Sequence, residues 1–193
     1  MKTPIAAAML LALSTTLGAQ QAAPSNPVTA AFRARIGALS REVAQALDSI
    51  PESKYGFRPT PAQMTIGNVA QHVAEDNYLF CDTFGPMKAD IPADEKNTPD
   101  SVKATWPKAT LMTQLKASFA YCARALDQVD DAKLAGQTSL TYDGRTMKVG
   151  LANMVLEHAL DLADHYSQLA NYMRLNDLLP PTALPRPKRG NGQ

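Results

Sequence analysis

The sequence of 193 residues has almost no net charge, because 19 lysines and arginines stand against 18 acidic residues. Lys2 is the only charged residue among the first 22, so loss of an N-terminal leader would leave 18 of each sign. Nucleic-acid binding needs clustered positive charge that neutralises phosphates. The basic cluster of Arg186, Lys188 and Arg189 lies in a proline- and glycine-rich tail that we expect to be disordered. The composition therefore argues against a nucleic-acid partner.

Long hydrophobic runs are also missing. An apolar run from Ile5 to Leu17 has the length of a signal-peptide core, and no later segment approaches the roughly eighteen apolar residues that a transmembrane helix needs. Lys2 precedes the run, and small residues follow at Gly18-Ala19 and Ala22-Ala23, which is the order found in secretory signal peptides. An ordinary N-terminal helix is the alternative. We expect residues 1–22 to be a signal peptide and the mature protein to be periplasmic or secreted, with no membrane association.

Residues that commonly carry chemistry are few, with three histidines and two cysteines. No Ser-His-Asp or Cys-His arrangement typical of nucleophilic catalysis is recognisable, and the sequence shows no Gly-rich phosphate loop. In an exported protein, Cys81 and Cys122 are expected to form a disulfide, because both fall in predicted helices that should be neighbours. Two separate buried thiols are the alternative interpretation.

Apolar residues recur at helical spacing in four long segments, which predicts an all-α protein. The predicted helices cover about residues 27–50, 65–84, 107–129 and 149–174. Four amphipathic helices of this length favour a four-helix bundle, which we assign to residues 23–182, followed by a flexible tail over residues 183–193.

Three connections join these helices. Residues 51–63 contain three prolines and a glycine, so we expect an extended, ordered connection in which Tyr55 and Phe57 pack against the helices. Residues 85–107 are expected to form a long loop. Residues 130–150 alternate weakly around Asp143-Gly144, which leaves a short hairpin and an irregular crossover both open.

The last predicted helix carries a row of polar residues. His158, Asp161 and His165 are spaced by three and four residues, and at 3.6 residues per turn this spacing places them on one side. The row borders an apolar stripe, so these side chains need hydrogen-bond partners or an ion. His72 occupies a similar edge position on the second helix. Charges nearby are expected to be solvated, although any could orient a ligand: Glu75, Asp76 and Glu157.

Two stretches taken together resemble the DinB-like proteins. KYGFRPTPAQMTIGNVAQHVAEDNYLFC, with its aromatic residues, its Arg-Pro pair and a histidine in the second helix, is similar to the front half of that family. HYSQLANYMRLNDLLPP resembles the family's fourth helix and its double-proline end. The likeness covers nearly all of the mature chain. It implies a four-helix bundle of the DinB and YfiT type, commonly with a divalent metal held by three histidines.

Carried over residue by residue, this resemblance makes His72 the ligand from the second helix and His165 the last ligand from the fourth. The middle ligand falls four residues before His165, where this sequence has Asp161. A carboxylate is also a legitimate ligand for zinc, which is the first candidate, and for nickel, iron or manganese. His158 lies one turn before the family position, and we expect it to orient Asp161 through a hydrogen bond.

Three functional classes follow. The first is a metal-dependent hydrolase or transferase acting on a small molecule, with His72, Asp161 and His165 leaving a position open for water or substrate. Some proteins that resemble this fold transfer thiols such as bacillithiol or use mycothiol in an isomerisation, but an exported protein would meet little of these cytosolic thiols. The second class is a non-catalytic module that binds a small molecule or a metal. The third is an interaction partner without a working site. The substrate stays open, as does the choice between monomer and homodimer.

Overall fold

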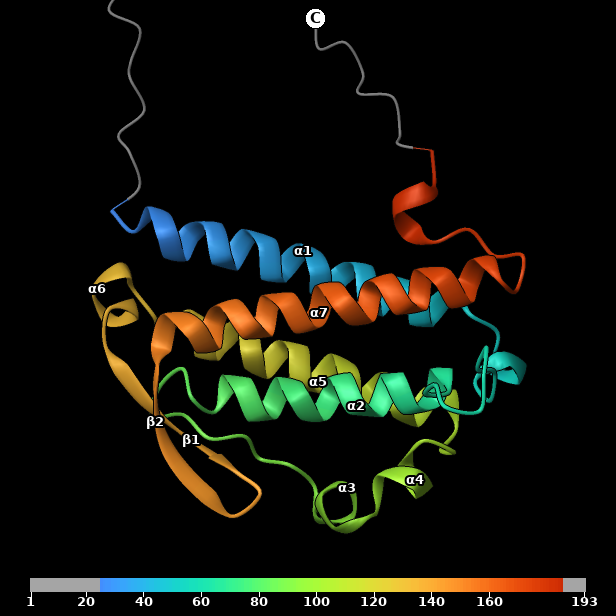
Figure 1. The fold of residues 1–193 in the computed structure, drawn as a ribbon, viewed down its shortest axis with the longest axis horizontal. Coiled ribbons are helices and arrows are strands. Elements are labelled where there is room, and N and C mark those ends of the chain that lie inside the picture. Colours follow the sequence, from blue (N-terminus) through green and yellow to red (C-terminus); the bar gives the residue numbers. More distant parts are fainter. Residues whose placement is uncertain (1–24, 186–193) are drawn as a thin grey trace, which may run out of the picture.

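The computed structural model describes residues 25–185, which form a bundle of four long helices in two layers (Figure 1). One layer contains α1 (Pro27–Ser49) and α7 (Leu151–Arg174), and the other contains α2 (Ile66–Cys81) and α5 (Lys108–Leu126). Helices of the same layer run in the same direction, opposite to those of the other layer. The expected all-α four-helix bundle is confirmed. The expected signal peptide and most of the expected tail lie outside the described residues.

Local signals in the sequence mark the helix ends. Pro27 lies in the first turn of α1, where backbone N–H groups have no partner within the helix, so the missing N–H of proline costs no hydrogen bond. Thr65 caps α2, because its side-chain oxygen accepts a hydrogen bond from the backbone N–H of Asn68 at 3.1 Å. Pro107 stands immediately before α5. These caps agree with the boundaries that the sequence predicts at the helix starts.

The segment between α2 and α5 differs from the expected loop because it contains two short helices, α3 (Ala93–Asn97) and α4 (Asp100–Lys103). Each follows a proline, Pro92 with φ −51° and Pro99 with φ −59°, which fixes a φ suited to the start of a helix. Acidic residues in both first turns suit the positive end of the helix dipole. Helices of one turn are too short to show an apolar period, so periodicity missed them.

The connection from α5 to α7 is a hairpin, one of the two alternatives that the sequence leaves open. After α6 (Asp131–Leu134), strand β1 (Gln137–Tyr142) pairs antiparallel with β2 (Arg145–Gly150). The two turn residues have positive φ, 51° at Asp143 and 72° at Gly144, as a tight two-residue hairpin turn requires. Strand β2 continues directly into α7, so the hairpin sets where that helix begins.

The connection before α2 is ordered and packs its aromatic side chains, as expected. The hydroxyl of Tyr55 donates to the backbone oxygen of Leu47 at 2.9 Å, and the ring of Phe57 meets Tyr172 of α7 edge-on with centroids 6.0 Å apart. The backbone oxygen of Tyr55 also accepts from the N–H of Gly67 at 2.8 Å, which joins this connection to the first turn of α2. Two single-turn 3-10 helices complete the fold: η1 (Glu52–Lys54) and η2 (Pro181–Ala183).

The hydrophobic core lies between the two layers. Each long helix contributes a side chain with no exposed surface: Val43, Val69, Leu115 and Leu162. Among the described residues, none of the helices combines the length and apolar character needed to span a membrane.

Candidate metal centre

The facing edges of α2 and α7 bring two histidines together. His72 on α2 and His165 on α7 have ring centroids 5.0 Å apart and ring planes at 86°. Antiparallel packing of the two helices explains this, because it aligns the edges of their buried faces along one groove. His165 is buried and His72 is half-buried, so the pair sits where the groove meets the surface.

Each histidine has an aspartate on its own helix, four residues away. Nε2 of His72 lies 3.1 Å from Oδ2 of Asp76, and Nε2 of His165 lies 3.4 Å from Oδ1 of Asp161. Residues four apart share a helix face, which brings each carboxylate beside its imidazole. The groove therefore holds two imidazoles, each with a carboxylate beside it, and we call these four side chains the His/Asp cluster.

Hydrogen bonds on the far side of His165 fix its tautomer. Nε2 of Gln168 donates to the hydroxyl of Tyr172 at 2.9 Å, so Oε1 of Gln168 is the atom that faces Nδ1 of His165 at 3.2 Å. This oxygen accepts a hydrogen bond from Nδ1–H. The other ring nitrogen, Nε2, is then directed at the cluster, as in metal-ligating histidines whose second nitrogen is held by an outer partner.

Burial and charge shift the pKa of two groups in the cluster. Burial raises the pKa of Asp76, with His72 opposing the shift and the nearby charge of Asp161 adding to it. Burial alone would lower the pKa of His165, but the hydrogen bond and charge of Asp161, together with Gln168 and Asp76, outweigh burial and raise it. Neighbouring carboxylates oppose each other's ionisation unless positive charge lies close to both.

The two side-chain oxygens of Asp161 differ in their surroundings. Its Oδ2 is buried and has no hydrogen-bond partner among the described residues, whereas Oδ1 faces His165. A buried carboxylate oxygen without a partner is unfavourable, and most buried polar atoms in folded proteins are paired. This unpaired oxygen is the feature of the cluster that a bound cation would explain most directly.

All three ligands proposed from the sequence lie at this one cluster, and ligation by them stays a prediction. Ligand atoms of His72, Asp76 and His165 lie within 4.8 Å of one another, and Asp161 joins them through His165. Asp76, which we expected to be a solvated charge, is instead half-buried beside His72. The four-residue spacing from His72 to Asp76 repeats that from Asp161 to His165, and this repeat is the signal that identifies Asp76 in the sequence.

A hollow of about 630 Å³ opens beside His165. Residues 59–64 of the connection before α2 form one wall, and the last turns of α7 form the other. The walls combine amide side chains with apolar and aromatic surface: Gln63, Met64, Gln168, Asn171 and Tyr172. A concave site with a few polar groups among apolar ones is typical of small-molecule binding.

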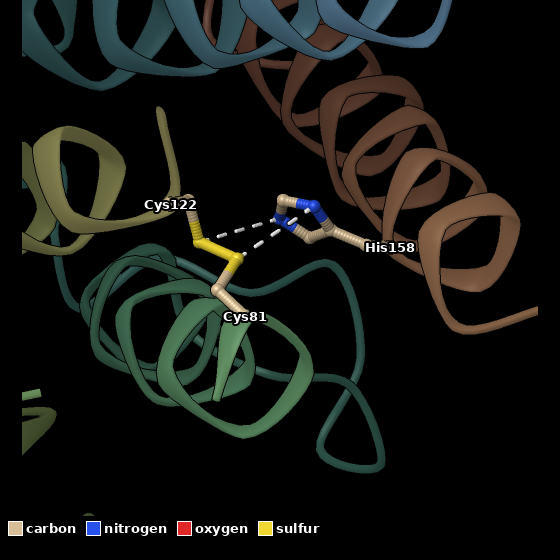
Figure 2. A group of neighbouring side chains, drawn as sticks. All are labelled: Cys81, Cys122 and His158. Carbon is tan, nitrogen blue, oxygen red and sulfur yellow. Dashed lines mark hydrogen bonds between the residues drawn. A yellow bond between two sulfur atoms is a disulfide. The ribbon is translucent and has the colours of Figure 1, made fainter. Parts of the chain in front are cut away.

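His158 does not support Asp161 in the way that the sequence predicts. Its side chain is fully buried, and Nε2 lies 2.8 Å from Oδ1 of Asn77 on α2. The ring points into the bundle, toward the sulfurs of Cys81 and Cys122 (Figure 2). Its hydrogen bond is to Asn77, so the expectation that His158 orients Asp161 through a hydrogen bond is wrong. Burial lowers the pKa of His158 to about 4, so the ring is neutral at neutral pH.

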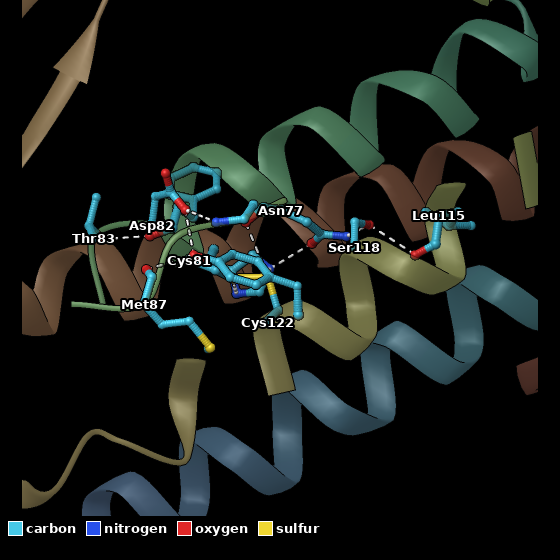
Figure 3. The surroundings of a disulfide bond; sticks show 12 residues. Asn77, Cys81, Asp82, Thr83, Met87, Leu115, Ser118 and Cys122 are labelled. Atoms are coloured by element: carbon cyan, nitrogen blue, oxygen red, sulfur yellow. Dashed lines mark hydrogen bonds between the residues drawn. A yellow bond between two sulfur atoms is a disulfide. The ribbon is translucent and has the colours of Figure 1, made fainter. Parts of the chain in front are cut away.

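Cys81 and Cys122 form the disulfide that the sequence favours over separate thiols. Their Cα atoms are 5.2 Å apart, and 41 positions separate them in the chain. Cys81 ends α2 and Cys122 lies on α5, so the bond joins the two helices of one layer (Figure 3).

Comparisons with known proteins agree with this architecture. The DinB superfamily profile matches residues 36–169, and no match was found among curated proteins. A DinB-like protein from Bacillus cereus superimposes with a TM-score of 0.60 and 17% identity, over 78% of this chain and 93% of that one. A mycothiol-dependent maleylpyruvate isomerase superimposes with a TM-score of 0.57 and 16% identity, over 73% of this chain and 60% of the isomerase. Identities this low show a shared fold only. Since the profile covers most of the bundle, the chain belongs to the DinB superfamily.

Proposed function

We propose that the protein is a divalent-metal-dependent hydrolase or transferase that acts on a small molecule at the His/Asp cluster. The observation that carries the proposal is the convergence of two imidazoles and two carboxylates from α2 and α7, with one buried oxygen of Asp161 unpaired among residues 25–185. The hollow beside His165 supplies space for a substrate next to the proposed ion.

The residues of the cluster fit a divalent cation. His72, Asp76 and His165 would hold it, because their ligand atoms lie within 4.8 Å of one another, and Asp161 would be a fourth donor. Imidazole and carboxylate donors suit zinc, the first candidate, as well as iron, nickel and manganese. When bound, such an ion would polarise a substrate atom or lower the pKa of a water molecule.

The chain's own residues would bind and orient the substrate. Gln168 holds the His165 ring so that Nε2 faces the cluster. Gln63 and Asn171 line the hollow and can both donate and accept hydrogen bonds, which suits a polar small molecule. Met64 and Tyr172 give apolar surface against which the rest of that molecule can pack.

A non-catalytic module that binds a metal or a small molecule is the second candidate. Burial favours it, because His165 exposes only 7% of its surface, and this limits the approach of a substrate to an ion held there. In that case the cluster would bind its metal without turnover.

Activity profiling separates the two candidates. The protein is loaded with zinc, nickel, iron or manganese in turn and tested on ester, amide and thiol substrates, with chelated protein as the blank. Thiols are included because the isomerase with the same fold is mycothiol-dependent. The proposal expects turnover that needs the metal and is lost in His165→Ala. Stoichiometric metal binding without turnover of any substrate class would favour the binding module.

We further propose that the protein is exported. The charged start and apolar run of the leader support export, and so does a disulfide between α2 and α5, because disulfides persist mainly in oxidising compartments. N-terminal sequencing of protein from the native host tests this proposal. A mature start between Gln20 and Pro24 in the extracytoplasmic fraction is expected, and intact Met1 in the cytosol would contradict it.

A further inference from the structure

A second group of metal-ligating side chains lies inside the bundle, apart from the His/Asp cluster. It consists of Cys81 on α2, Cys122 on α5 and His158 on α7, which together we call the Cys/His cluster (Figure 2). Sγ of Cys81 lies 4.0 Å from Nδ1 of His158, and Sγ of Cys122 lies 3.9 Å from Nε2. All three residues are buried. Three helices therefore deliver two sulfurs and an imidazole to one point.

A chain of hydrogen bonds through Asn77, Ser118 and Leu115 (Figure 3) fixes the orientation of the Asn77 amide, and with it the tautomer of His158. Oγ of Ser118 donates to the backbone oxygen of Leu115 at 2.9 Å and accepts from Nδ2 of Asn77 at 2.8 Å. This contact orients the Asn77 amide so that its Oδ1 faces His158, and Oδ1 can only accept. Nε2 of His158 must then carry the proton that it donates to Asn77 at 2.8 Å.

The consequence is a free lone pair on Nδ1 of His158, the nitrogen that lies 4.0 Å from Cys81. In metal sites, a ligating histidine typically donates its other ring N–H to an oxygen acceptor, which fixes the ring and its tautomer. His158 already has this arrangement, with Asn77 as the acceptor. The rings of Phe80 and Phe84 lie 5.7 and 5.8 Å from the imidazole and give the cluster an apolar wall.

We propose that the disulfide masks a second metal site, and that reduction uncovers a Cys81/Cys122/His158 site that binds zinc. A dithiol reductant supplies two electrons and two protons, the S–S bond breaks, two thiols form, and the reductant becomes a disulfide. Zn²⁺ then binds both sulfurs as thiolates, and two protons leave to solvent. The neutral His158 contributes the Nδ1 lone pair without losing a proton.

The positions of the donors suit this ion. Zinc–sulfur bonds of about 2.3 Å and zinc–nitrogen bonds of about 2.0 Å need donors roughly 3.5 to 3.8 Å apart. Sγ of Cys81 already lies 4.0 Å from Nδ1 of His158, and the two sulfurs, which are bonded to each other in this structure, would move apart to that separation after reduction. Thiolate donors favour zinc over harder cations such as magnesium or calcium. The zinc would replace the disulfide as a link between α2 and α5 and would add α7 to it.

This site is separate from the His/Asp cluster and does not depend on the proposed function. His158 and His165 are seven residues apart on α7, which is about 10 Å along a helix, so one ion cannot bind both. The oxidised protein would therefore offer one metal site, and the reduced protein would offer two.

Cobalt(II) is the probe for the test, because cobalt bound to thiolates gives a charge-transfer absorption that carboxylate and imidazole ligands do not give. The protein carries His165→Ala to disable the His/Asp cluster. It is reduced with a dithiol, freed of reductant without oxygen, and titrated. The reduced protein should bind one equivalent with the thiolate band, which zinc then removes, whereas the oxidised protein should show no band.

His158→Gln is the matched control, because the glutamine Nε2 can keep the hydrogen bond to Asn77 while the Nδ1 donor is lost. Its affinity for cobalt after reduction should fall at least about tenfold. Equal affinity in the two proteins, or no thiolate band in the reduced parent, would overturn the proposal. If reduction itself unfolds the helices, far-UV circular dichroism measures the effect of zinc on helicity. Zinc should then restore helicity in the reduced parent and not in reduced His158→Gln. A parent that stays unfolded with zinc would also overturn the proposal.

Discussion

Asp161 is the residue of the His/Asp cluster whose replacement tests metal binding most directly. Its two oxygens are in different situations, since one faces His165 and the other is buried without a partner in the part of the chain that the structure describes. In the absence of a cation this carboxylate also opposes the ionisation of Asp76. A divalent ion would satisfy the unpaired oxygen and relieve the repulsion between the carboxylates.

Asp161→Asn should therefore weaken metal binding without harming the metal-free fold. The amide has nearly the same shape but no charge, so we expect at least a tenfold loss of metal affinity, about 1.4 kcal/mol or more. Competition titration with a chromophoric chelator measures the affinity, and urea unfolding in chelator measures stability. Asp164→Asn is the matched control, because Asp164 lines the hollow and lies outside the cluster. Wild-type affinity in Asp161→Asn would remove Asp161 from the ligand set.

His158 should make the oxidised protein sensitive to mild acid. Burial lowers its folded-state pKa from 6.5 to about 4, so the unfolded chain binds a proton more readily than the folded one between these values. Its contribution to stability is complete above pH 6.5 and is lost as the pH falls toward 4, a loss of about 3 kcal/mol. Urea unfolding at a series of pH values measures this. In His158→Gln the same interval should show a shallower dependence, and identical slopes would contradict the assignment.

At the residue scale, the sequence located most of the cluster but not all of it. His72, Asp161 and His165 were found because their positions on predicted helices and the resemblance to DinB-like proteins agree. Asp76 was missed because a half-exposed acid on a helix is usually solvated. The partner of His158 was missed because helix spacing describes neighbours along α7, whereas Asn77 lies on α2 and meets His158 only after the helices pack.

At the scale of elements, the disulfide compensates for a long connection. α2 and α5 are neighbours in one layer, yet the chain between them includes α3 and α4 before α5 begins. The disulfide and the hydrogen bond between Asn77 and Ser118 join the two helices directly.

Removal of the disulfide should cost about 4 kcal/mol of unfolding free energy, given a loop of 41 residues. The bond limits the unfolded chain, so the double variant Cys81→Ala/Cys122→Ala should unfold at lower urea concentration than the oxidised parent. The single variant Cys81→Ala is the control and should lose a similar amount, because it also lacks the bond. A double variant as stable as the oxidised parent would show that the disulfide does not stabilise the folded protein.

The start of α2 depends on a glycine at a close contact. A Cβ added at Gly67 would lie 2.2 Å from the backbone oxygen of Ala104, just after α4, so Gly67→Ala must push these segments apart. We expect a loss of about 2 kcal/mol in urea unfolding. Gly56→Ala is the control, because a Cβ there meets no described atom within 4 Å. Equal stability of the two variants would mean that α4 moves away freely.

The element pattern also shows where sequence reasoning stops. The four long helices were predicted because each shows several repeats of the apolar period. α3 and α4 were not, because one turn contains no repeat. Each begins directly after a proline, Pro92 or Pro99, and α4 packs beside α2. The hairpin stayed undecided because its strands are largely exposed, so their alternation of apolar and polar residues is weak.

At the scale of the whole molecule, the antiparallel arrangement of the two layers creates both clusters. It places His72 opposite His165 near the surface and Cys81 opposite His158 in the interior. The bundle was predictable from four amphipathic helices. Which residues of α2 and α7 face each other depends on the register of the two helices, and the apolar pattern of the sequence does not predict that register.

The most direct test of the central claim is the metal content of untagged, oxidised protein, measured by elemental analysis after saturation with zinc and removal of free metal. We expect one equivalent per chain in the wild type, and the same in His158→Gln, which leaves the His/Asp cluster intact. His165→Ala should lose the stoichiometric metal while keeping its helical content. A wild type that binds no metal, or His165→Ala that retains a full equivalent, would contradict the assignment of this site.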